Sequence, residues 1–246
     1  MTGTLRVNEV YLSLQGESTF AGLPCVFVRL TGCNLRCSYC DTAYAFTEGF
    51  RQTHEEILAA VENLTPAYDR APRVDGHRLP LIEFTGGEPL LQPGAAELMA
   101  TLCDRGWTVL VETSGAIDLG DLDPRIRRIM DLKTPSSGES GRIHWPNLAH
   151  LKSTDEIKLV IGTQEDYAWV KTAISEHRLA ERCPLLVSWV HPLHSGQIDP
   201  SLNPVPPDHT PITRQELVES IIADALPVRF QAQLHKVIWS PDQRGV

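Results

Sequence analysis

The hydrophobic and polar positions of this 246-residue chain alternate between short apolar runs and helical spacings. The run PCVFVRL at 24–30 is apolar and β-branched and leads to a glycine, which predicts a strand. THEEILAAVENL at 53–64 predicts a helix, because its apolar positions share one face and Thr53 and Glu56 can form a capping box. The same patterns predict further strands at 79–84, 107–112, 125–132, 155–162, 184–190 and 228–239, and further helices at 95–106, 165–177 and 213–226.

Strands that alternate with helices predict parallel strands joined by crossovers, hence an α/β fold. About six mainly parallel strands are too few for a closed eight-fold barrel, so we expect a partial (β/α) barrel. No linker divides the chain, and residues 1–246 are expected to form a single domain. Two stretches, 136–153 and 191–211, have no regular pattern, and loops of that length in a compact domain are often functional.

The composition argues against several classes of protein. The net charge is −9, whereas a nucleic-acid surface needs clustered Lys and Arg, so no nucleic-acid partner is expected. No window approaches the run of about 18 apolar residues that spans a bilayer, so no membrane association is expected. The N-terminus has no charged-then-apolar export pattern, and we therefore expect a cytoplasmic protein.

The six cysteines of a cytoplasmic chain are not expected to form disulfides, because cellular reductants keep thiols reduced. Three of them have apolar neighbours and are expected to be small buried hydrophobic residues: Cys25, Cys103 and Cys183. Cys33, Cys37 and Cys40 instead crowd into TGCNLRCSYCDT at 31–42, where three thiolates can bind a soft metal or a cluster. A structural zinc site or a ferredoxin-like carrier would require a fourth ligand. Three thiolates on a four-iron cluster would leave one iron open for chemistry.

The spacing CxxxCxxC, with Tyr39 before the last cysteine, resembles the radical S-adenosylmethionine superfamily, and TGGEP at 85–89 resembles its second motif. The resemblance implies that the three cysteines hold a [4Fe–4S] cluster whose open iron binds S-adenosylmethionine. Gly86 and Gly87 would let backbone groups approach the ligand without an intervening side chain. The acidic Glu88 would suit the ammonium group of the methionine part. Taken alone, the two motifs would also fit a zinc loop and an ordinary glycine-rich turn.

Two further stretches resemble one family within that superfamily, the 7-carboxy-7-deazaguanine synthases. They are VYLSLQGES at 10–18 and QAQLHKVIW at 231–239, a predicted strand. The family implies conversion of 6-carboxy-5,6,7,8-tetrahydropterin to 7-carboxy-7-deazaguanine with loss of ammonia, in 7-deazapurine (queuosine precursor) biosynthesis. It also implies that a 5′-deoxyadenosyl radical abstracts hydrogen from the pterin and that Mg²⁺ assists.

The resemblance assigns roles to individual residues. The expected pterin contacts are Leu14, Gln15, Gly16, Arg29 and Thr85. The expected S-adenosylmethionine contacts are Tyr39, Gly87, Glu88, Ser114 and Lys133. Thr42 would ligate Mg²⁺ through its hydroxyl, because this hard cation prefers oxygen. Arg29 would meet the substrate carboxylate with its planar fork; without the family it would also fit an arginine pointing outward from a half-buried strand.

The partners implied by the resemblance are the pterin, an electron donor such as flavodoxin or ferredoxin, and a second copy of the chain in a homodimer. The alternative within the superfamily is a small activase of a glycyl-radical enzyme. The alternatives outside it are a zinc-binding adaptor and a plain electron carrier. His191 and His194 are expected to make ordinary polar contacts. Residues 240–246 extend beyond the family's usual end, and the role of the final residue stays open.

Overall fold

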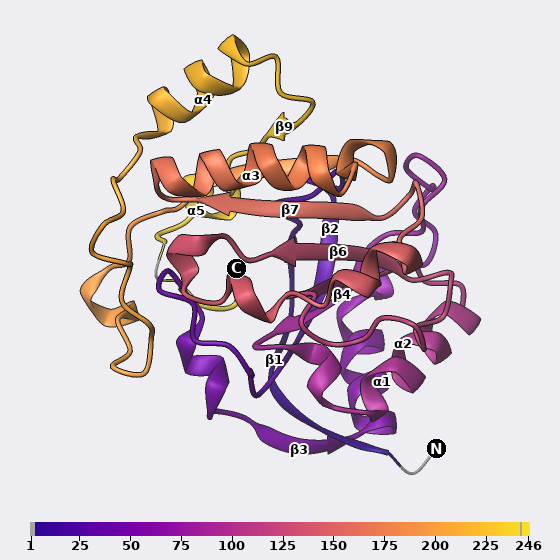
Figure 1. Ribbon diagram of the computed structural model, residues 1–246. Coiled ribbons are helices and arrows are strands. Elements are labelled where there is room, and N and C mark those ends of the chain that lie inside the picture. Colours follow the sequence, from indigo (N-terminus) through magenta and orange to yellow (C-terminus); the bar gives the residue numbers. More distant parts are fainter. Residues whose placement is uncertain (1–2, 242) are drawn as a thin grey trace.

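One mixed sheet runs through the molecule, with helices packed on its outer face (Figure 1). This computed structural model describes residues 3–241 and 243–246. In that part of the chain the strands are β1 (Thr4–Leu14), β2 (Pro24–Leu30), β3 (Phe50–Thr53), β4 (Leu81–Gly86), β5 (Val109–Thr113), β6 (Arg127–Leu132), β7 (Glu156–Ile161), β8 (Leu185–Trp189) and β9 (Arg229–Phe230). The α-helices are α1 (His54–Leu64), α2 (Gly94–Asp104), α3 (Gln164–Glu176), α4 (Arg214–Ala223) and α5 (His235–Ile238).

The strand order is β3-β1-β2-β4-β5-β6-β7-β8-β9. β2 and β4 to β9 run parallel, whereas β1 pairs antiparallel with both β2 and β3. The strands rotate along the sheet, from β2, upright in Figure 1, to β7, which runs across the view. β3 and β9 lie at opposite ends of the order, so the sheet stays open among the described residues. The prediction of a mostly parallel partial barrel is confirmed.

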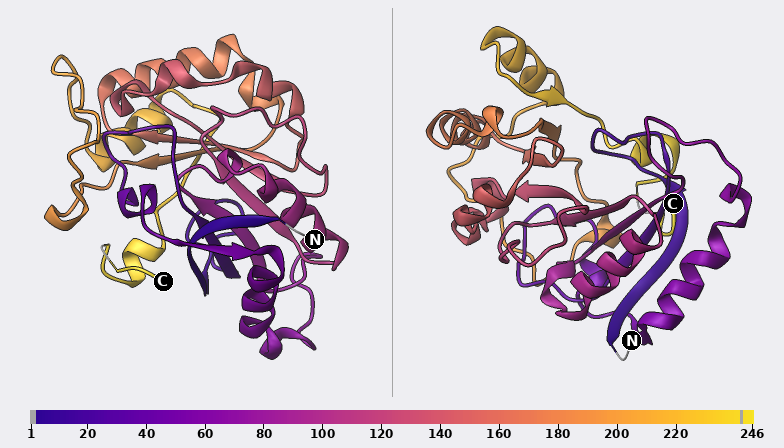
Figure 2. Two further views of the ribbon diagram at one scale, coloured as in Figure 1. Left: turned by 90° about the horizontal axis from the view of Figure 1, so that it is seen from below. Right: turned by 90° about the vertical axis from the view of Figure 1, so that its right-hand side faces the viewer.

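Helices α1 to α4 begin within one residue of their predicted starts. Capping boxes start three of them: Thr53 with Glu56 in α1, Thr163 with Asp166 in α3, and Thr213 with Glu216 in α4. Helix residues such as Ile57, Leu98 and Val170 pack into the main core against outward-facing strand residues. Figure 2 shows α1 and α2 close to β1, whereas α4 lies at the other end of the molecule.

Side chains alternate between the two faces of each strand, and this alternation separates the core from a cavity. In β2 the helix-facing residues are Val26, Val28 and Leu30. Near the amino ends of the strands the inner face is apolar, and a second small core includes Cys25, Phe27, Leu81, Leu110 and Ile129. Farther along the same face the residues are charged and line a cavity: Arg29, Glu83, Glu112, Asp131 and Lys158. The inner face therefore changes from a packed base to a polar site.

The structure differs from the sequence pattern mainly near the two ends of the chain. The pattern does not predict β1 or β3. The predicted strand at 228–239 is wrong, because only Arg229–Phe230 pairs with β8 and the chain then enters α5. The backbone N–H of Leu234 donates to the Gly16 carbonyl (2.8 Å), which draws the chain away from the sheet edge.

Most other element ends shift by only one or two residues. The three cysteines expected to be buried hydrophobic residues are confirmed as such: Cys25, Cys103 and Cys183. Within the described residues, no helix has the length and apolar character that crossing a bilayer requires.

Candidate functional site

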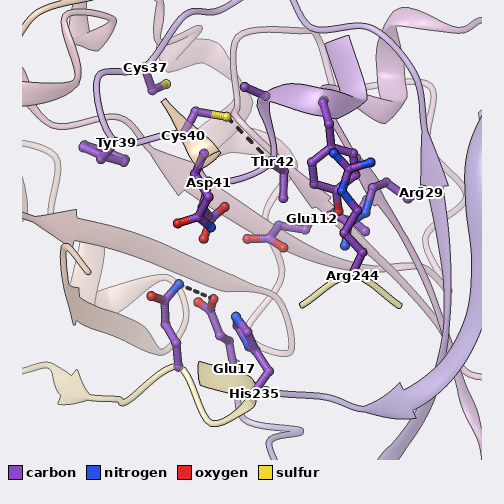
Figure 3. Close-up of a pocket in the computed structure, with 18 of the residues that line it drawn as sticks. Glu17, Arg29, Cys37, Tyr39, Cys40, Asp41, Thr42, Glu112, His235 and Arg244 are labelled. Carbon is purple, nitrogen blue, oxygen red and sulfur yellow. Dashed lines mark hydrogen bonds between the residues drawn. The ribbon is translucent and has the colours of Figure 1, made fainter. Parts of the chain in front are cut away.

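A cavity of about 620 Å³ opens at the carboxyl ends of the parallel strands, where loops from several strands converge. This volume is within the range that holds a small molecule, and strand carboxyl ends are where open α/β sheets bind ligands. Figure 3 shows side chains from the loop after β2, from β5 and from the C-terminal segment around this space. The two superfamily motifs, at 31–42 and 85–89, are therefore brought to one place.

The cluster loop, residues 31–42, carries Cys33, Cys37 and Cys40, and all three line the cavity. Burial raises the pKa of each thiol, and it raises that of Cys37 to about 12. No three His, Cys, Asp or Glu side chains in the described part of the chain converge closely enough to hold a single metal ion. A [4Fe–4S] cluster does not require its ligands to converge on a single ion, because each thiolate binds a different iron of the cluster. Three thiols facing one cavity therefore fit such a cluster.

The TGGEP turn, residues 85–89, lies directly against the cluster loop. A Cβ on Gly87 would fall 2.0 Å from the Gly32 carbonyl oxygen and 2.9 Å from the Cys33 Cβ. Gly86 has a φ of +134°, and its Cβ would fall 2.1 Å from the Leu30 carbonyl oxygen. Because these contacts involve backbone atoms, side chains here would separate the two motifs. The backbone N–H of Glu88 donates to Gly32 (2.8 Å) and fixes this approach.

Glu88 is fully buried, and its carboxylate joins the TGGEP turn to the end of β5. It accepts hydrogen bonds from the Thr113 hydroxyl (2.9 Å), from the Ser114 backbone N–H (2.7 Å) and from the Ser114 hydroxyl (2.6 Å). Glu88 is not among the residues that line the cavity, whereas Thr113 and Ser114 are. Direct contact between Glu88 and S-adenosylmethionine stays a prediction; the structure gives its side chain a role in holding Ser114.

The other residues expected to contact S-adenosylmethionine lie on the same side of the cavity. Tyr39 and Lys133 both line it, and the Lys133 ammonium lies 6.0 Å from the centre of the Tyr39 ring. Asp131 pairs with Lys133 at 2.7 Å, so the ammonium is held next to the cluster loop. Burial acts to lower the pKa of Lys133, but Asp131, Cys37 and Tyr39 together outweigh it and the net pKa is raised.

The charged floor of the cavity consists of Glu17, Glu112, Asp131 and Lys158. The Lys158 ammonium lies 2.6 Å from Glu17, 2.7 Å from Glu112 and 4.0 Å from Asp131. Burial acts to raise the pKa of Glu112, but the nearby cations, Lys158 foremost, together lower it more. Burial and the Glu112 charge raise the pKa of the neighbouring Glu83 well above its usual value. The fixed charges of the floor thus lie next to the carboxyl group of Glu83, which favours its neutral form.

The expected pterin contacts Leu14, at the end of β1, and Gln15 and Gly16, in the loop that follows, all line the cavity. The Gln15 amide donates to Glu83, and its oxygen accepts from the Glu17 backbone N–H (3.0 Å). A Cβ on Gly16 would fall 2.3 Å from Nδ1 of His235, so glycine is needed for α5 to approach this loop. A pterin contact by the Gln15 amide stays a prediction.

Arg29 and Thr85, the remaining expected pterin contacts, also line the cavity. The Arg29 guanidinium points inward, donating from Nε to Glu9 (2.7 Å) and from Nη2 to the Tyr11 hydroxyl (2.9 Å). The side chain is 12% exposed, which differs from an arginine that points into solvent. The role of Arg29 as anchor of a substrate carboxylate stays a prediction.

Thr42, the expected Mg²⁺ ligand, lines the cavity with its hydroxyl 3.8 Å from the Cys40 sulfur (Figure 3). Its neighbour Asp41 pairs with Lys236 of α5 at 2.5 Å. Burial acts to raise the pKa of Asp41, but Lys236, with His235 and Lys158, outweighs it and holds the pKa at about 2. The Asp41 carboxylate, a second oxygen group that could bind a metal ion beside Thr42, is therefore already paired with the Lys236 ammonium.

The C-terminal segment completes the wall of the cavity. Gln243, Arg244, Gly245 and Val246 all line it. The Arg244 guanidinium lies 3.7 Å from the centre of the Tyr44 ring and pairs with Glu48 at 2.8 Å.

His191 and His194 have ring centres 6.4 Å apart, and His191 contacts the Pro192 carbonyl (3.1 Å).

Several residues that line the site are not predicted from the sequence: Glu17, Asp41, Glu83, Glu112, Asp131, Lys158, His235 and Lys236. The signal for most of them was present, because a charged residue inside an otherwise apolar strand is unusual. In EIKLVI the single Lys158 is flanked by Ile157 and Leu159, which face the core. His235 and Lys236 of α5 are not recognised, because residues 228–239 are wrongly predicted to form a strand.

Comparison with known proteins adds independent findings. A family model described as the radical SAM superfamily matches residues 27–175. The 7-carboxy-7-deazaguanine synthase of Chlorobaculum tepidum is 40% identical, over 98% of this chain and 97% of the relative. That of Koribacter versatilis is 37% identical, over 98% of this chain and 100% of the relative.

Solved structures agree on the fold. QueE from Escherichia coli aligns with a TM-score of 0.67 at 20% identity, covering 94% of this chain and 95% of that one. Streptococcus suis SuiB aligns with a TM-score of 0.54 at 12% identity, covering 81% of this chain and 46% of that one. The similarity thus extends over nearly the whole length of this chain.

Proposed function

We propose that this chain, which belongs to the 7-carboxy-7-deazaguanine synthase family of the radical SAM superfamily, converts 6-carboxy-5,6,7,8-tetrahydropterin to 7-carboxy-7-deazaguanine with loss of ammonia. The reaction supplies a precursor for queuosine, a 7-deazapurine. One observation carries the proposal: the three motif thiols and the charged floor line the same cavity. A cluster site and a polar small-molecule site therefore share one cavity.

The cofactors follow from the donors in this cavity. Cys33, Cys37 and Cys40 would hold a [4Fe–4S] cluster, and the TGGEP turn beside them would hold S-adenosylmethionine. When bound, this pair supplies an organic radical by reductive cleavage of the sulfonium. Our proposal includes Mg²⁺ bound by the Thr42 hydroxyl, because Mg²⁺ prefers oxygen ligands and retains bound water.

The residues of the chain would bind and orient the pterin. A carboxytetrahydropterin offers several N–H donors and one carboxylate, so it suits a cavity with fixed carboxylates and fixed cations. Arg29 would bind the substrate carboxylate, since Glu9 and Tyr11 already orient its planar fork. Glu17 and Glu112 would accept N–H groups of the ring, with Lys158 holding both carboxylates in place. The apolar base formed by Phe27 and its neighbours would limit the entry of water.

The partners of the reaction are also proposals. A small electron carrier such as flavodoxin or ferredoxin would reduce the cluster, and the chain would act as a homodimer and a single domain. The electron donor and the homodimer rest on family membership alone, whereas the single domain rests on the absence of a linker in the sequence. Light scattering on the purified protein measures the dimer, and reduction of the cluster by each carrier measures the donor.

A product assay tests the proposed function. The protein is purified without oxygen, reconstituted with iron and sulfide, and mixed with reductant, S-adenosylmethionine, Mg²⁺ and the carboxypterin. We expect 7-carboxy-7-deazaguanine and ammonia in equal amounts, detected by mass spectrometry. The Cys37→Ala variant serves as the control and should form neither. A protein that cleaves S-adenosylmethionine but releases no deazapurine would contradict the proposed substrate.

A further inference from the structure

The two irregular segments, 136–153 and 191–211, meet on the outer side of the cluster loop. Their meeting point is Arg36, which directly precedes Cys37. The Arg36 backbone N–H donates to Oε1 of Glu139 at 2.7 Å, and its carbonyl accepts from the Asn203 backbone N–H at 2.8 Å. Both backbone groups of one loop residue are therefore taken up by segments far away in the sequence.

Glu139 joins the two segments as well as the loop. The same oxygen, Oε1, also accepts from the Asn203 side-chain amide at 3.0 Å. The neighbouring Gly138 has a φ of +74°, and a Cβ there would lie 2.9 Å from Nδ2 of Asn203. Glycine at 138 is thus needed for Asn203 to reach Glu139. The contact depends on three residues together: Gly138, which leaves space, the Glu139 carboxylate and the Asn203 amide.

The peptide on the other side of Cys37 is fixed in the same way. The Ser38 hydroxyl donates to the Ser136 carbonyl (2.7 Å), and its backbone N–H donates to the Ser137 carbonyl (3.1 Å). The turn that offers these carbonyls is itself held by Asp166 of α3. The fully buried Asp166 carboxylate accepts from the Ser136 backbone N–H (2.7 Å) and hydroxyl (2.5 Å).

We propose that Glu139 is a positioning residue for the cluster, which fixes Cys37 by holding the Arg36 peptide together with Asn203. Asp166 supports the opposite side through the Ser136 turn. Groups that orient the residues binding a metal often matter nearly as much as the ligands themselves. This inference rests on the cluster in the proposed function, but it does not depend on the pterin substrate.

The test compares Glu139→Ala with Glu165→Ala. Glu165 is a matched control, because its carboxylate accepts a backbone N–H from the same irregular segment, that of Thr210 (2.8 Å), but does not contact the cluster loop. The first measurement uses the apo-protein. We expect hydrogen exchange at the Arg36 amide to become about tenfold faster or more in Glu139→Ala, the factor that losing a charge-assisted hydrogen bond implies. Glu165→Ala should exchange at this amide as the wild type does.

The second measurement is the cluster itself. After reconstitution, Glu139→Ala should bind less iron per chain and show a shifted reduction potential, whereas Glu139→Gln, which keeps an acceptor oxygen, should recover much of both. If Glu139→Ala fails to fold, Asn203→Ala removes the amide contact and should speed exchange at Arg36 in the same direction. Unchanged exchange, iron content and potential in folded Glu139→Ala or Asn203→Ala would overturn the inference. A wild type that loads the cluster but makes no deazapurine would affect only the proposed substrate.

Discussion

Replacing Lys158 by methionine removes the ammonium that two carboxylates share in the charged floor. Lys158 is 6% exposed, and it lies 2.6 Å from Glu17 and 2.7 Å from Glu112. Removing one partner of a buried pair usually costs about 3–5 kcal/mol, because an uncompensated charge remains. Glu17 and Glu112 retain some contact with water, so we expect the lower end, about 3 kcal/mol of unfolding free energy at pH 7.

The pH dependence of this loss has a defined sign. The folded-state pKa of Glu112 is lowered by Lys158, so its contribution is present above the unfolded value of 4.5 and disappears as the pH falls through the folded value. The folded-state pKa of Lys158 is raised, so its contribution is complete below the unfolded value of 10.5 and disappears as the pH rises through the folded value. The loss in Lys158→Met should therefore be largest between these limits and shrink in acid.

Urea unfolding of the apo-protein, followed by circular dichroism at several pH values, measures this loss. Lys171→Met is the matched control: Lys171 pairs with Asp224 at 2.8 Å, but both side chains are well exposed, so we expect a cost below about 1 kcal/mol. Adding Glu112→Gln to Lys158→Met should restore stability, because it removes one unpaired charge. A loss under about 1 kcal/mol, or a further loss in the double variant, would refute the reasoning.

Three further outcomes are expected. Gly87→Ala places a Cβ 2.0 Å from the Gly32 carbonyl oxygen, so we expect it to lose about 1–3 kcal/mol of unfolding free energy in urea and to bind less iron per chain after reconstitution. Gly141→Ala is the control, because a Cβ there has no atom within 4 Å, and it should match the wild type in both measurements. Arg29→Ala should weaken pterin binding about tenfold or more in calorimetry while leaving S-adenosylmethionine binding nearly unchanged, and equal losses would show that its role is misassigned. Burial lowers the pKa of His235, so part of the stability should be lost as the pH falls below the unfolded value of 6.5; His235→Gln should flatten that dependence, and an equally steep urea-derived profile would contradict the assignment.

The parts of this protein that the sequence predicts well are those encoded locally. The cluster loop and the TGGEP turn are recognisable because their spacing is fixed within a few residues, and the capping boxes of α1 and α4 identify helix starts in the same way. The strand at 228–239 failed for the opposite reason. Its alternation fits a strand, but pairing with β8 ends at Phe230, and after one more hydrogen bond, from Gln231 to Val187, the chain turns to the loop at Gly16.

The charged floor could be predicted only in part. Lys158 and Glu112 are recognisable as charges in apolar strands, but their purpose depends on which face of the sheet encloses the cavity. That choice is made by distant elements: α1, α2 and α3 cover one face, and the opposite face is left to the site. Local sequence patterns could not predict the contact between Glu139 and Asn203, because it joins two segments that have no hydrophobic periodicity.

The supports of the cluster loop come late in the chain, and this has a consequence for biosynthesis. The loop ends at residue 42, but the contacts that fix it require Glu139, Asp166 and Asn203. At about 5–20 residues per second, a ribosome needs on the order of ten seconds or more to reach them. During that interval the three cysteines stand on a stretch of nascent polypeptide that lacks these contacts, so the loop obtains its supports only after most of the chain has been translated.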